Sequence, residues 1–276
     1  MLRSVPEKGF AVLDCLSNMA AVKSTLIDSE VEYFSNLSAN WWTSLKGLEK
    51  QNKLRVPYII NSLVETGKIS RETAKSGKPL TGIKILDVGC GGGFSTELLA
   101  ELGAQVTGLD PSIKLIECAR EHLKEREDIE DRVEYVHGTI ETFCEQHIEH
   151  YDHVVAAEIL EHIQVRDLFV KACVKTLKPG GTYFVSTINR TVKAWLHMIL
   201  YLEYVVGSIP RGTHHWNLLV TPNETRSWIE NADCTIVTIN GWWQSADGEW
   251  QECDDTSTTY YMIAVKKYGQ SSLLPK

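Results

Sequence analysis

The sequence lacks the cysteine pattern of a disulfide-rich or zinc-ribbon protein. Its seven cysteines are an odd number, and no two of them stand at C-x-x-C spacing. Small secreted folds and structural zinc sites use closely spaced pairs of cysteines, so neither class fits this chain. The pattern is typical of a reducing compartment such as the cytosol or an organelle matrix.

Long hydrophobic runs and an excess of basic residues are missing too. No apolar run reaches the roughly 20 residues that a membrane-spanning helix needs, and the nearest candidate, residues 194–209, contains His197 and Glu203. The 36 acidic residues outnumber the 28 basic ones and give a net charge of −8. A broad basic face that binds nucleic acid is therefore not expected.

We expect four parts along the chain. Residues 1–30 form an N-terminal extension, 31–81 a helical cap, 82–267 the main domain and 268–276 a tail. The extension carries basic residues, as a mitochondrial presequence does, but also acids, which presequences avoid. These residues therefore fit either a targeting segment or an extension without a targeting role.

From residue 82 onward, short apolar runs alternate with amphipathic segments. Such alternation is typical of a parallel, doubly wound sheet with helices on both faces. We therefore expect an α/β, Rossmann-like fold whose mostly parallel sheet has seven strands, the last one antiparallel. The strands are expected at residues 84–88, 105–110, 133–137, 151–157, 182–187, 235–240 and 260–265, with helices at 94–102, 113–123, 168–177 and 223–231 and an inserted helix at 191–206.

A glycine-rich turn follows the first expected strand. Gly89, Gly91 and Gly93 stand between that strand and the next helix, where glycine permits a tight turn or the close approach of a ligand to the backbone. A purely structural turn is the alternative. The dinucleotide pattern needs a glycine where this chain has Phe94, which disfavours a nicotinamide dehydrogenase.

Two acids flank this turn. Asp87 precedes the first glycine and would repel a pyrophosphate, but it could pair with the ammonium of an amino-acid-like cofactor. Asp110 ends the second expected strand, where a carboxylate binds ribose hydroxyls in nucleoside sites of this kind. Together with Gly89 and Gly91, these acids fit a nucleoside without phosphates, such as S-adenosylmethionine.

Glu158, Glu161 and His162 follow the fourth expected strand. On one helical turn, residues at this spacing share a face, and two carboxylates with one imidazole can bind a divalent cation. Oxygen ligands favour Mg²⁺, although the histidine also suits Mn²⁺, Fe²⁺ or Zn²⁺. Two alternatives stay open: a solvated helix start, where acids are favoured by the helix dipole, and His162 as a general base.

Several segments extend this pattern beyond the glycine turn. They are residues 85–93, 106–111, 158–162, 186–190 and 212–214, with Phe34, Trp41-Trp42 and residues 52–55 upstream. Together they resemble the ubiquinone-biosynthesis O-methyltransferases, a family of class I S-adenosylmethionine-dependent methyltransferases, over roughly residues 31–267. The stretch between Trp42 and Arg55, Trp242-Trp243 and the acidic run 249–255 depart from the family pattern.

The resemblance implies a function and a set of site residues. Its members methylate a hydroxyl of polyprenylated dihydroxybenzoate and demethylubiquinol, and eukaryotic members are mitochondrial. The implied cofactor contacts are Arg55, Gly89, Asp110 and the backbone of Ala157, to which the turn adds Asp87 and Gly91. The implied ligands of a divalent metal, Mg²⁺, are Glu158, Glu161 and His162. No catalytic base is assigned, although His162 is a candidate.

The same resemblance implies partners and a location. A polyprenyl tail stays in the bilayer, so we expect a peripheral protein on the matrix side of the mitochondrial inner membrane, with other ubiquinone-biosynthesis proteins nearby. A cytoplasmic location is the alternative. The segment 195–206, flanked by Lys193 and Arg211, suits a helix lying in the membrane interface. The other interpretation turns its apolar face inward over an acceptor pocket.

Three alternative functions remain. A metal-independent methyltransferase of another small acceptor is the nearest one. A nicotinamide dehydrogenase is the second alternative. It would be distinguished from a methyltransferase by testing whether a nicotinamide cofactor or S-adenosylmethionine raises the melting temperature. A catalytically silent scaffold is disfavoured by the intact glycine turn and acid–histidine cluster.

Overall fold

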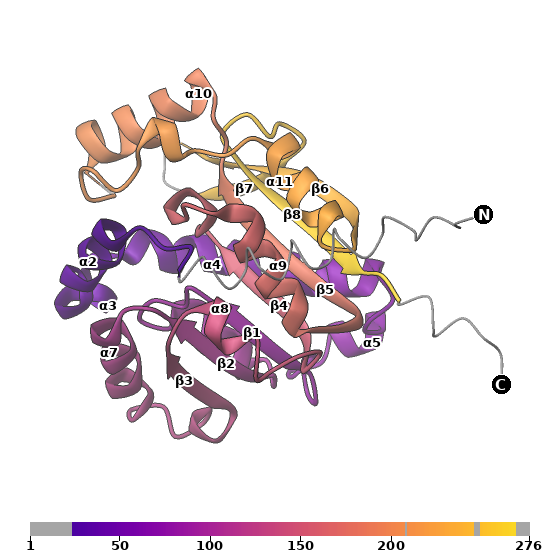
Figure 1. Ribbon diagram of the computed structural model, residues 1–276. Helices are drawn as coiled ribbons and strands as arrows, with labels where there is room; N and C mark the ends of the chain where they lie inside the picture. Colours follow the sequence, from indigo (N-terminus) through magenta and orange to yellow (C-terminus); the bar gives the residue numbers. More distant parts are fainter. Residues whose placement is uncertain (1–23, 208, 246–248, 269–276) are drawn as a thin grey trace, which may run out of the picture.

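One sheet of eight strands, in the order β3-β2-β1-β4-β5-β8-β6-β7, forms the centre of the molecule (Figure 1). The computed structural model describes residues 24–207, 209–245 and 249–268. The strands are β1 (Lys84–Val88), β2 (Gln105–Asp110), β3 (Val133–His137), β4 (Tyr151–Ala157), β5 (Leu177–Ile188), β6 (Cys234–Gln244), β7 (Trp250–Cys253) and β8 (Thr259–Lys266). The pairs joining β3, β2, β1, β4 and β5 are parallel.

The expected antiparallel last strand is confirmed. β8 lies between β5 and β6 and is antiparallel to both. The expected count of seven strands is wrong, because β7 adds an eighth at the sheet edge, antiparallel to β6. β7 falls within the acidic run at 249–255, and its short, half-exposed sequence carries little of the apolar alternation that predicts a strand.

Helices cover both faces of the sheet and bury two apolar cores. On one face, α4 (Lys46–Glu65), α6 (Phe94–Glu101) and α7 (Ile113–Leu123) pack on Ile85 and Val106. On the other, α8 (Ile140–Phe143), α9 (Arg166–Thr176) and α11 (Pro222–Asn231) pack on Leu86 and Val154. Neighbouring residues of β1 thus serve opposite faces, as the period-two side-chain alternation of a strand requires. Because both faces are covered, the central strands β1, β4 and β5 are buried over most of their length.

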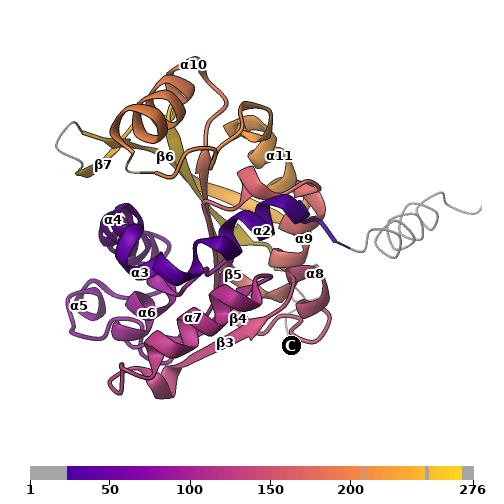
Figure 2. The same cartoon turned by 90° about the vertical axis from the view of Figure 1, so that its left-hand side faces the viewer.

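The N-terminal helices lie across the carboxyl ends of the parallel strands. They are α2 (Asp28–Asn36), η1 (Ser38–Asn40), α3 (Trp41–Ser44) and the start of α4, with α5 (Arg71–Ala74) farther along. Figure 2 shows α2 crossing this edge between α7 and α10 (Val192–Ala194). The strand order reverses between β1 and β4, which is where ligands bind in open α/β sheets, so the helical cap covers the ligand edge.

The inserted helix after β5 is present, but most of it is a π-helix. α10 continues into η4 (Trp195–Val206), and long π-helical stretches are rare and often lie at functional sites. η4 is apolar on both sides: Met198, Ile199 and Leu202 are buried against Ile188, whereas residues such as Leu200 are exposed. Across the described residues, no helix is both long and apolar enough to span a membrane.

Candidate functional site

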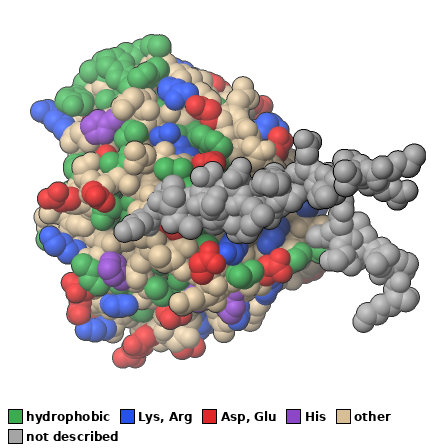
Figure 3. All heavy atoms as spheres, viewed as in Figure 1, with side chains coloured by type: hydrophobic (Ala, Val, Ile, Leu, Met, Phe, Trp, Pro, Cys, Tyr) green, Lys and Arg blue, Asp and Glu red, His purple; other side chains and the backbone are tan. Residues whose placement is uncertain are grey.

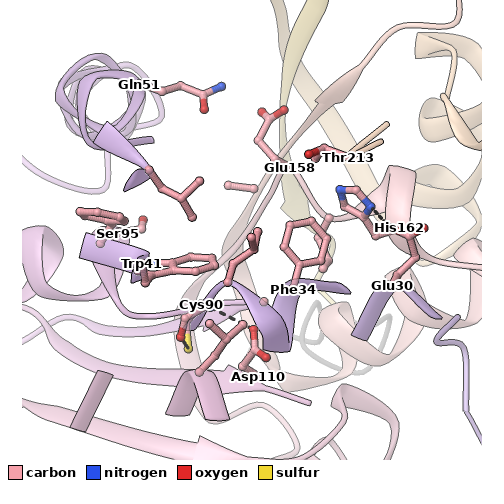
Figure 4. Close-up of a pocket in the computed structure, with 18 of the residues that line it drawn as sticks. Glu30, Phe34, Trp41, Gln51, Cys90, Ser95, Asp110, Glu158, His162 and Thr213 are labelled. Carbon is pink, nitrogen blue, oxygen red and sulfur yellow. Dashed lines mark hydrogen bonds and ion pairs between the residues drawn. The ribbon is translucent and has the colours of Figure 1, made fainter. Parts of the chain in front are cut away.

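A deep pocket lies between the helical cap and the carboxyl edge of the sheet. Figure 4 shows Asp110 and Cys90 at one end of it and Glu30, His162 and Thr213 at the other, with Phe34 between them. The expected site residues Arg55, Asp87, Gly89, Gly91, Asp110, Ala157, Glu158 and His162 all line this pocket. Residues expected from three strand ends and from the cap therefore share one cavity.

The glycine turn at the end of β1 has a backbone that only glycine adopts readily. Gly89, Gly91 and Gly93 have φ values of +74°, +55° and +100°, in the region where a Cβ is strained. The indole ring of Trp41 packs over Gly91 so closely that a side chain there would overlap it. The turn therefore brings bare backbone to the floor of the pocket beneath an aromatic lid.

Asp110, at the end of β2, is tied to this turn. Its Oδ2 accepts the backbone N–H of Gly91 at 2.9 Å, and its Oδ1 accepts that of Ser112 at 2.8 Å. Burial raises the pKa of Asp110 to about 6 despite these hydrogen bonds. A carboxylate accepts about four hydrogen bonds, so Asp110 retains capacity for two more.

Asp87 and Arg55 provide opposite charges on the same side of the turn. Asp87 accepts a hydrogen bond from Thr96 at 2.6 Å, and burial raises its pKa to about 6. Arg55, on α4, is buried; its Nε donates to the hydroxyl of Tyr261 at 2.6 Å, and another nitrogen donates to Asn52. Within the described residues, the remaining nitrogen of Arg55, Nη2, has no hydrogen-bond partner, and it lies 3.7 Å from Glu158 Oε1.

Glu158 does not lie where the spacing predicted. Its φ is +53°, and the 3₁₀ turn η3 (Leu160–His162) begins only two residues later. The expectation that Glu158, Glu161 and His162 share one face of a helical turn is therefore wrong. Ser186 donates its hydroxyl to Glu158 Oε1 at 2.6 Å, and Nη2 of Arg55 lies 3.7 Å from the same oxygen, so Glu158 contacts Ser186 and Arg55.

Glu161 and His162 are both buried: His162 lines the other end of the pocket, whereas Glu161 is not among the residues that line it. Thr187 donates to Glu161 Oε2 at 2.7 Å, while Oε1 is buried with no hydrogen-bond partner among the described residues. Burial and the charge of Glu158 raise the pKa of Glu161. His162 Nδ1 lies 2.7 Å from Glu30 Oε2, and burial lowers the pKa of the ring.

Three residues of this cluster were missed in the sequence as site residues: Glu30, Glu203 and His214. His214 joins Glu161 and His162, and each of these three residues offers a ligand atom within 4.8 Å of the others. Two signals were available: His214 belongs to the Gly-Thr-His segment quoted for the family resemblance, and Glu203 is the acid that interrupts the apolar run 194–209. Nothing in the sequence around Glu30 singled it out.

The wall beyond this cluster is apolar. Ile163, Ile188, Met198 and Ile209 line the pocket there. The hydroxyls of Tyr33 on α2 and Thr213 lie 2.8 Å apart and link the cap to the loop after η4. A ligand reaching past the cluster would therefore contact side chains suited to an aromatic or aliphatic group.

This chain is similar in sequence to known methyltransferases. A family model described as a methyltransferase domain matches residues 86–185. The mitochondrial ubiquinone biosynthesis O-methyltransferase of Rattus norvegicus is 35% identical over 259 residues, which is 92% of this chain and 74% of that protein. The ubiquinone biosynthesis O-methyltransferase of a Chelativorans species is 37% identical over 265 residues, 92% of this chain and 100% of that protein.

A solved structure supports the fold alone. The magnesium protoporphyrin IX methyltransferase of Synechocystis, crystallised with bound SAH, is 17% identical, has a TM-score of 0.54, and aligns with 80% of this chain and 84% of that one. The expected Rossmann-like methyltransferase fold is thereby confirmed.

Proposed function

Because this chain belongs to the ubiquinone biosynthesis O-methyltransferases, we propose that it transfers a methyl group from S-adenosylmethionine to a catechol-type hydroxyl of polyprenylated ubiquinone precursors. S-adenosylmethionine dependence and O-methylation follow from the family. The proposed acceptors are the dihydroxybenzoate and the demethylubiquinol that the sequence resemblance implies.

The observation that carries the proposal is one pocket with two chemically different ends. Asp110, Gly91 and Arg55 line one end, and His162 and His214 line the other, with Glu161 buried close to both histidines. Ala157, at the end of β4, lines the pocket beside Glu158. Bimolecular methyl transfer needs two adjacent subsites whose occupants meet in line, and the two ends of the pocket support assigning one subsite to each.

Each cofactor residue has a proposed role. Asp110 accepts hydrogen bonds from the ribose hydroxyls, and the backbone of Gly89 and Gly91 allows the cofactor to approach closely. The methionyl group carries a carboxylate and an ammonium, which suit the guanidinium of Arg55 and the carboxylate of Asp87.

A divalent cation at the acid–histidine end is part of the proposal. The orphaned Glu161 Oε1 and its proximity to two imidazoles fit such an ion. When bound, the ion lowers the pKa of a vicinal diol and orients one oxygen. Glu158, the third ligand implied by the resemblance, instead binds Ser186. The expectation of Mg²⁺ stays a prediction.

A membrane surface is the proposed source of the acceptor. Exposed apolar residues gather along α10 and η4, visible as the green cluster at the top of Figure 3. They are Val192, Trp195, Leu196, Leu200, Tyr201, Tyr204, Val205 and Val206. The inner side of the same helix reaches the pocket through Met198, so a tail lying along η4 would have a short route from lipid to the site.

Location and partners follow from the same reasoning. Relatives in animals are named mitochondrial, and bacterial relatives also exist. We propose a peripheral protein at the matrix face of the inner membrane, in contact with other ubiquinone-biosynthesis proteins. The segment expected to carry a targeting signal lies largely outside the described residues.

The test is a methyl-transfer assay on a dihydroxybenzoate with a short prenyl chain, with and without chelator. We expect a product heavier by one methylene unit, formed only with S-adenosylmethionine and suppressed by chelator. Transfer that is indifferent to chelator would favour the alternative, a metal-independent methyltransferase. The absence of any O-methylated product would contradict the proposal.

A further inference from the structure

Both histidines of the acid–histidine cluster are hydrogen-bonded in the same way. Nδ1 of His162 lies 2.7 Å from Glu30 Oε2, and Nδ1 of His214 lies 2.6 Å from Glu203 Oε1. An imidazole that donates from Nδ1 to a carboxylate carries its lone pair on Nε2 and has a fixed ring orientation. Both rings therefore present Nε2 as a ready ligand.

Burying the carboxylate of Glu203 costs free energy, and holding the ring of His214 gives a reason for that burial. Glu203 is completely buried, and it is the one acidic residue of the largely apolar helix η4. Besides the ring of His214, its carboxylate accepts the backbone N–H groups of Gly212 and His214 at 2.9 and 3.1 Å. A buried carboxylate held by three donors fixes both the loop and the ring of His214.

Glu161 supplies the third ligand atom. Its Oε2 is held by Thr187, whereas Oε1 has no partner in the described part of the chain although the residue is 99% buried. Leaving a buried carboxylate oxygen unpaired costs free energy, and a cation between Glu161 and the two rings would remove that cost.

We propose that Glu161, His162 and His214 form a two-histidine, one-carboxylate site for a divalent first-row transition metal, and that Glu30 and Glu203 orient the two rings. Two neutral imidazoles favour Mn²⁺, Co²⁺ or Zn²⁺ over Mg²⁺, which prefers oxygen ligands and water. The proposal deepens the proposed function, on which it rests for the role of the metal beside the acceptor.

Glu158 lies outside this set. Its left-handed backbone directs the side chain to Ser186, and its carboxylate is near Arg55. Sequence spacing therefore groups Glu158 with Glu161 and His162. In the folded chain, the third ligand beside Glu161 and His162 is instead His214, which lies more than 50 residues farther along.

The test is calorimetric titration of the metal-stripped full chain with MnCl₂ and, separately, MgCl₂. We expect Mn²⁺ to bind at least about tenfold more tightly than Mg²⁺. His214→Ala should weaken Mn²⁺ binding by about tenfold or more, while His150→Ala, an exposed histidine at the opposite end of β4, should leave it unchanged. Glu158→Gln should weaken Mn²⁺ binding less than His214→Ala does, because it removes a nearby charge but no ligand. S-adenosylmethionine affinity, measured in parallel, verifies that each variant is folded.

The role of Glu203 in orienting the ring of His214 is tested by a separate measurement. Glu203→Gln should weaken Mn²⁺ binding by about ten- to a hundredfold and change the visible absorption of bound Co²⁺, with S-adenosylmethionine affinity retained. Should Glu203→Gln not fold, Glu30→Gln tests the same role at His162.

Two results would overturn the inference: His214→Ala binding Mn²⁺ as the unaltered chain does, or Glu158→Gln losing Mn²⁺ binding while His214→Ala retains it. Neither result touches the proposed function, because methyl transfer from S-adenosylmethionine is measured separately, with and without chelator.

Discussion

Gly91 donates its backbone N–H to the carboxylate of Asp110 at 2.9 Å, so the glycine turn after β1 and the end of β2 are joined by a charged hydrogen bond. The acid proposed to hold the ribose thus also shapes the turn beneath the cofactor. Changes at either residue should affect cofactor binding before they affect the sheet, because both lie at strand ends.

Replacing Asp110 should weaken S-adenosylmethionine binding. Hydrogen bonds to a charged group contribute about 1.5–3 kcal/mol, so Asp110→Ala should lose about ten- to a hundredfold in affinity by calorimetric titration. Asp131→Ala, an exposed acid near the start of β3, is the matched control and should bind normally. An unchanged affinity in folded Asp110→Ala would remove the ribose role.

Gly91 and Gly82 form a matched pair for the turn. Both have positive φ, but a side chain at Gly82 would meet nothing, whereas one at Gly91 would meet Trp41. Each change to alanine should cost about 1 kcal/mol or more of stability from backbone strain, measured by chemical denaturation. Only Gly91→Ala should also lose cofactor affinity, and equal affinities of the two variants would argue that the turn is purely structural.

Cofactor affinity should fall in acid. Burial raises the pKa of Asp87 and of Asp110 from about 4 to about 6, and the proposed contacts use their ionised forms. The dissociation constant should therefore be flat above pH 7 and rise as the pH drops below about 6.

The contribution of these two carboxyl groups to the stability of the free protein should follow the opposite trend. Because their pKa values are raised in the native state, the native state binds more protons than the unfolded chain between pH 4 and 6, so their contribution to stability increases as the pH falls.

Titrations of the cofactor at several pH values would measure the first trend, and denaturant unfolding would measure the second. Asp110→Asn should remove part of the pH dependence of binding, because Asp87 still titrates. A binding constant that is constant from pH 8 to pH 5 would contradict the assigned contacts.

The outer side of η4 should bind lipid. Leu200→Glu together with Val205→Glu places two charges on the exposed apolar side and should abolish flotation with cardiolipin-containing vesicles, since such binding depends on buried apolar area. Ile148→Glu makes the same change at another exposed apolar residue and should float normally. Retained flotation of the double variant, with turnover of a soluble acceptor intact, would show that the helix is not the anchor.

Most of the sheet could be predicted because its information is local. β1, β2, β3 and β4 begin and end at the predicted residues, since each is a short apolar run bounded by turn residues. β5 begins five residues before the predicted start, because a register shift between Tyr151 and His153 lets Leu177 pair with Tyr151 ahead of the glycines. Such a shift depends on the neighbouring strand and has no local signal.

The candidate site likewise contains residues that local sequence predicts and residues that it does not. Asp87, Gly91 and Asp110 could be found because ligand sites of this fold lie at strand ends. Glu158 was misplaced because its left-handed backbone is uncommon for glutamate and is imposed by the surroundings. Glu30, Glu203 and His214 meet only through tertiary packing, and no spacing within one segment brings them together.

The central claim is tested most directly by comparing two acceptors: a short-chain prenylated benzoate with two vicinal hydroxyls, and the same molecule with one of them removed. Initial rates of methyl transfer from S-adenosylmethionine would be measured for both by mass spectrometry. We predict O-methylation of the diol, and at least about a hundredfold lower rate on the single hydroxyl, because the diol alone can be chelated and oriented. Equal rates on the two acceptors, or no transfer to the diol, would contradict the account.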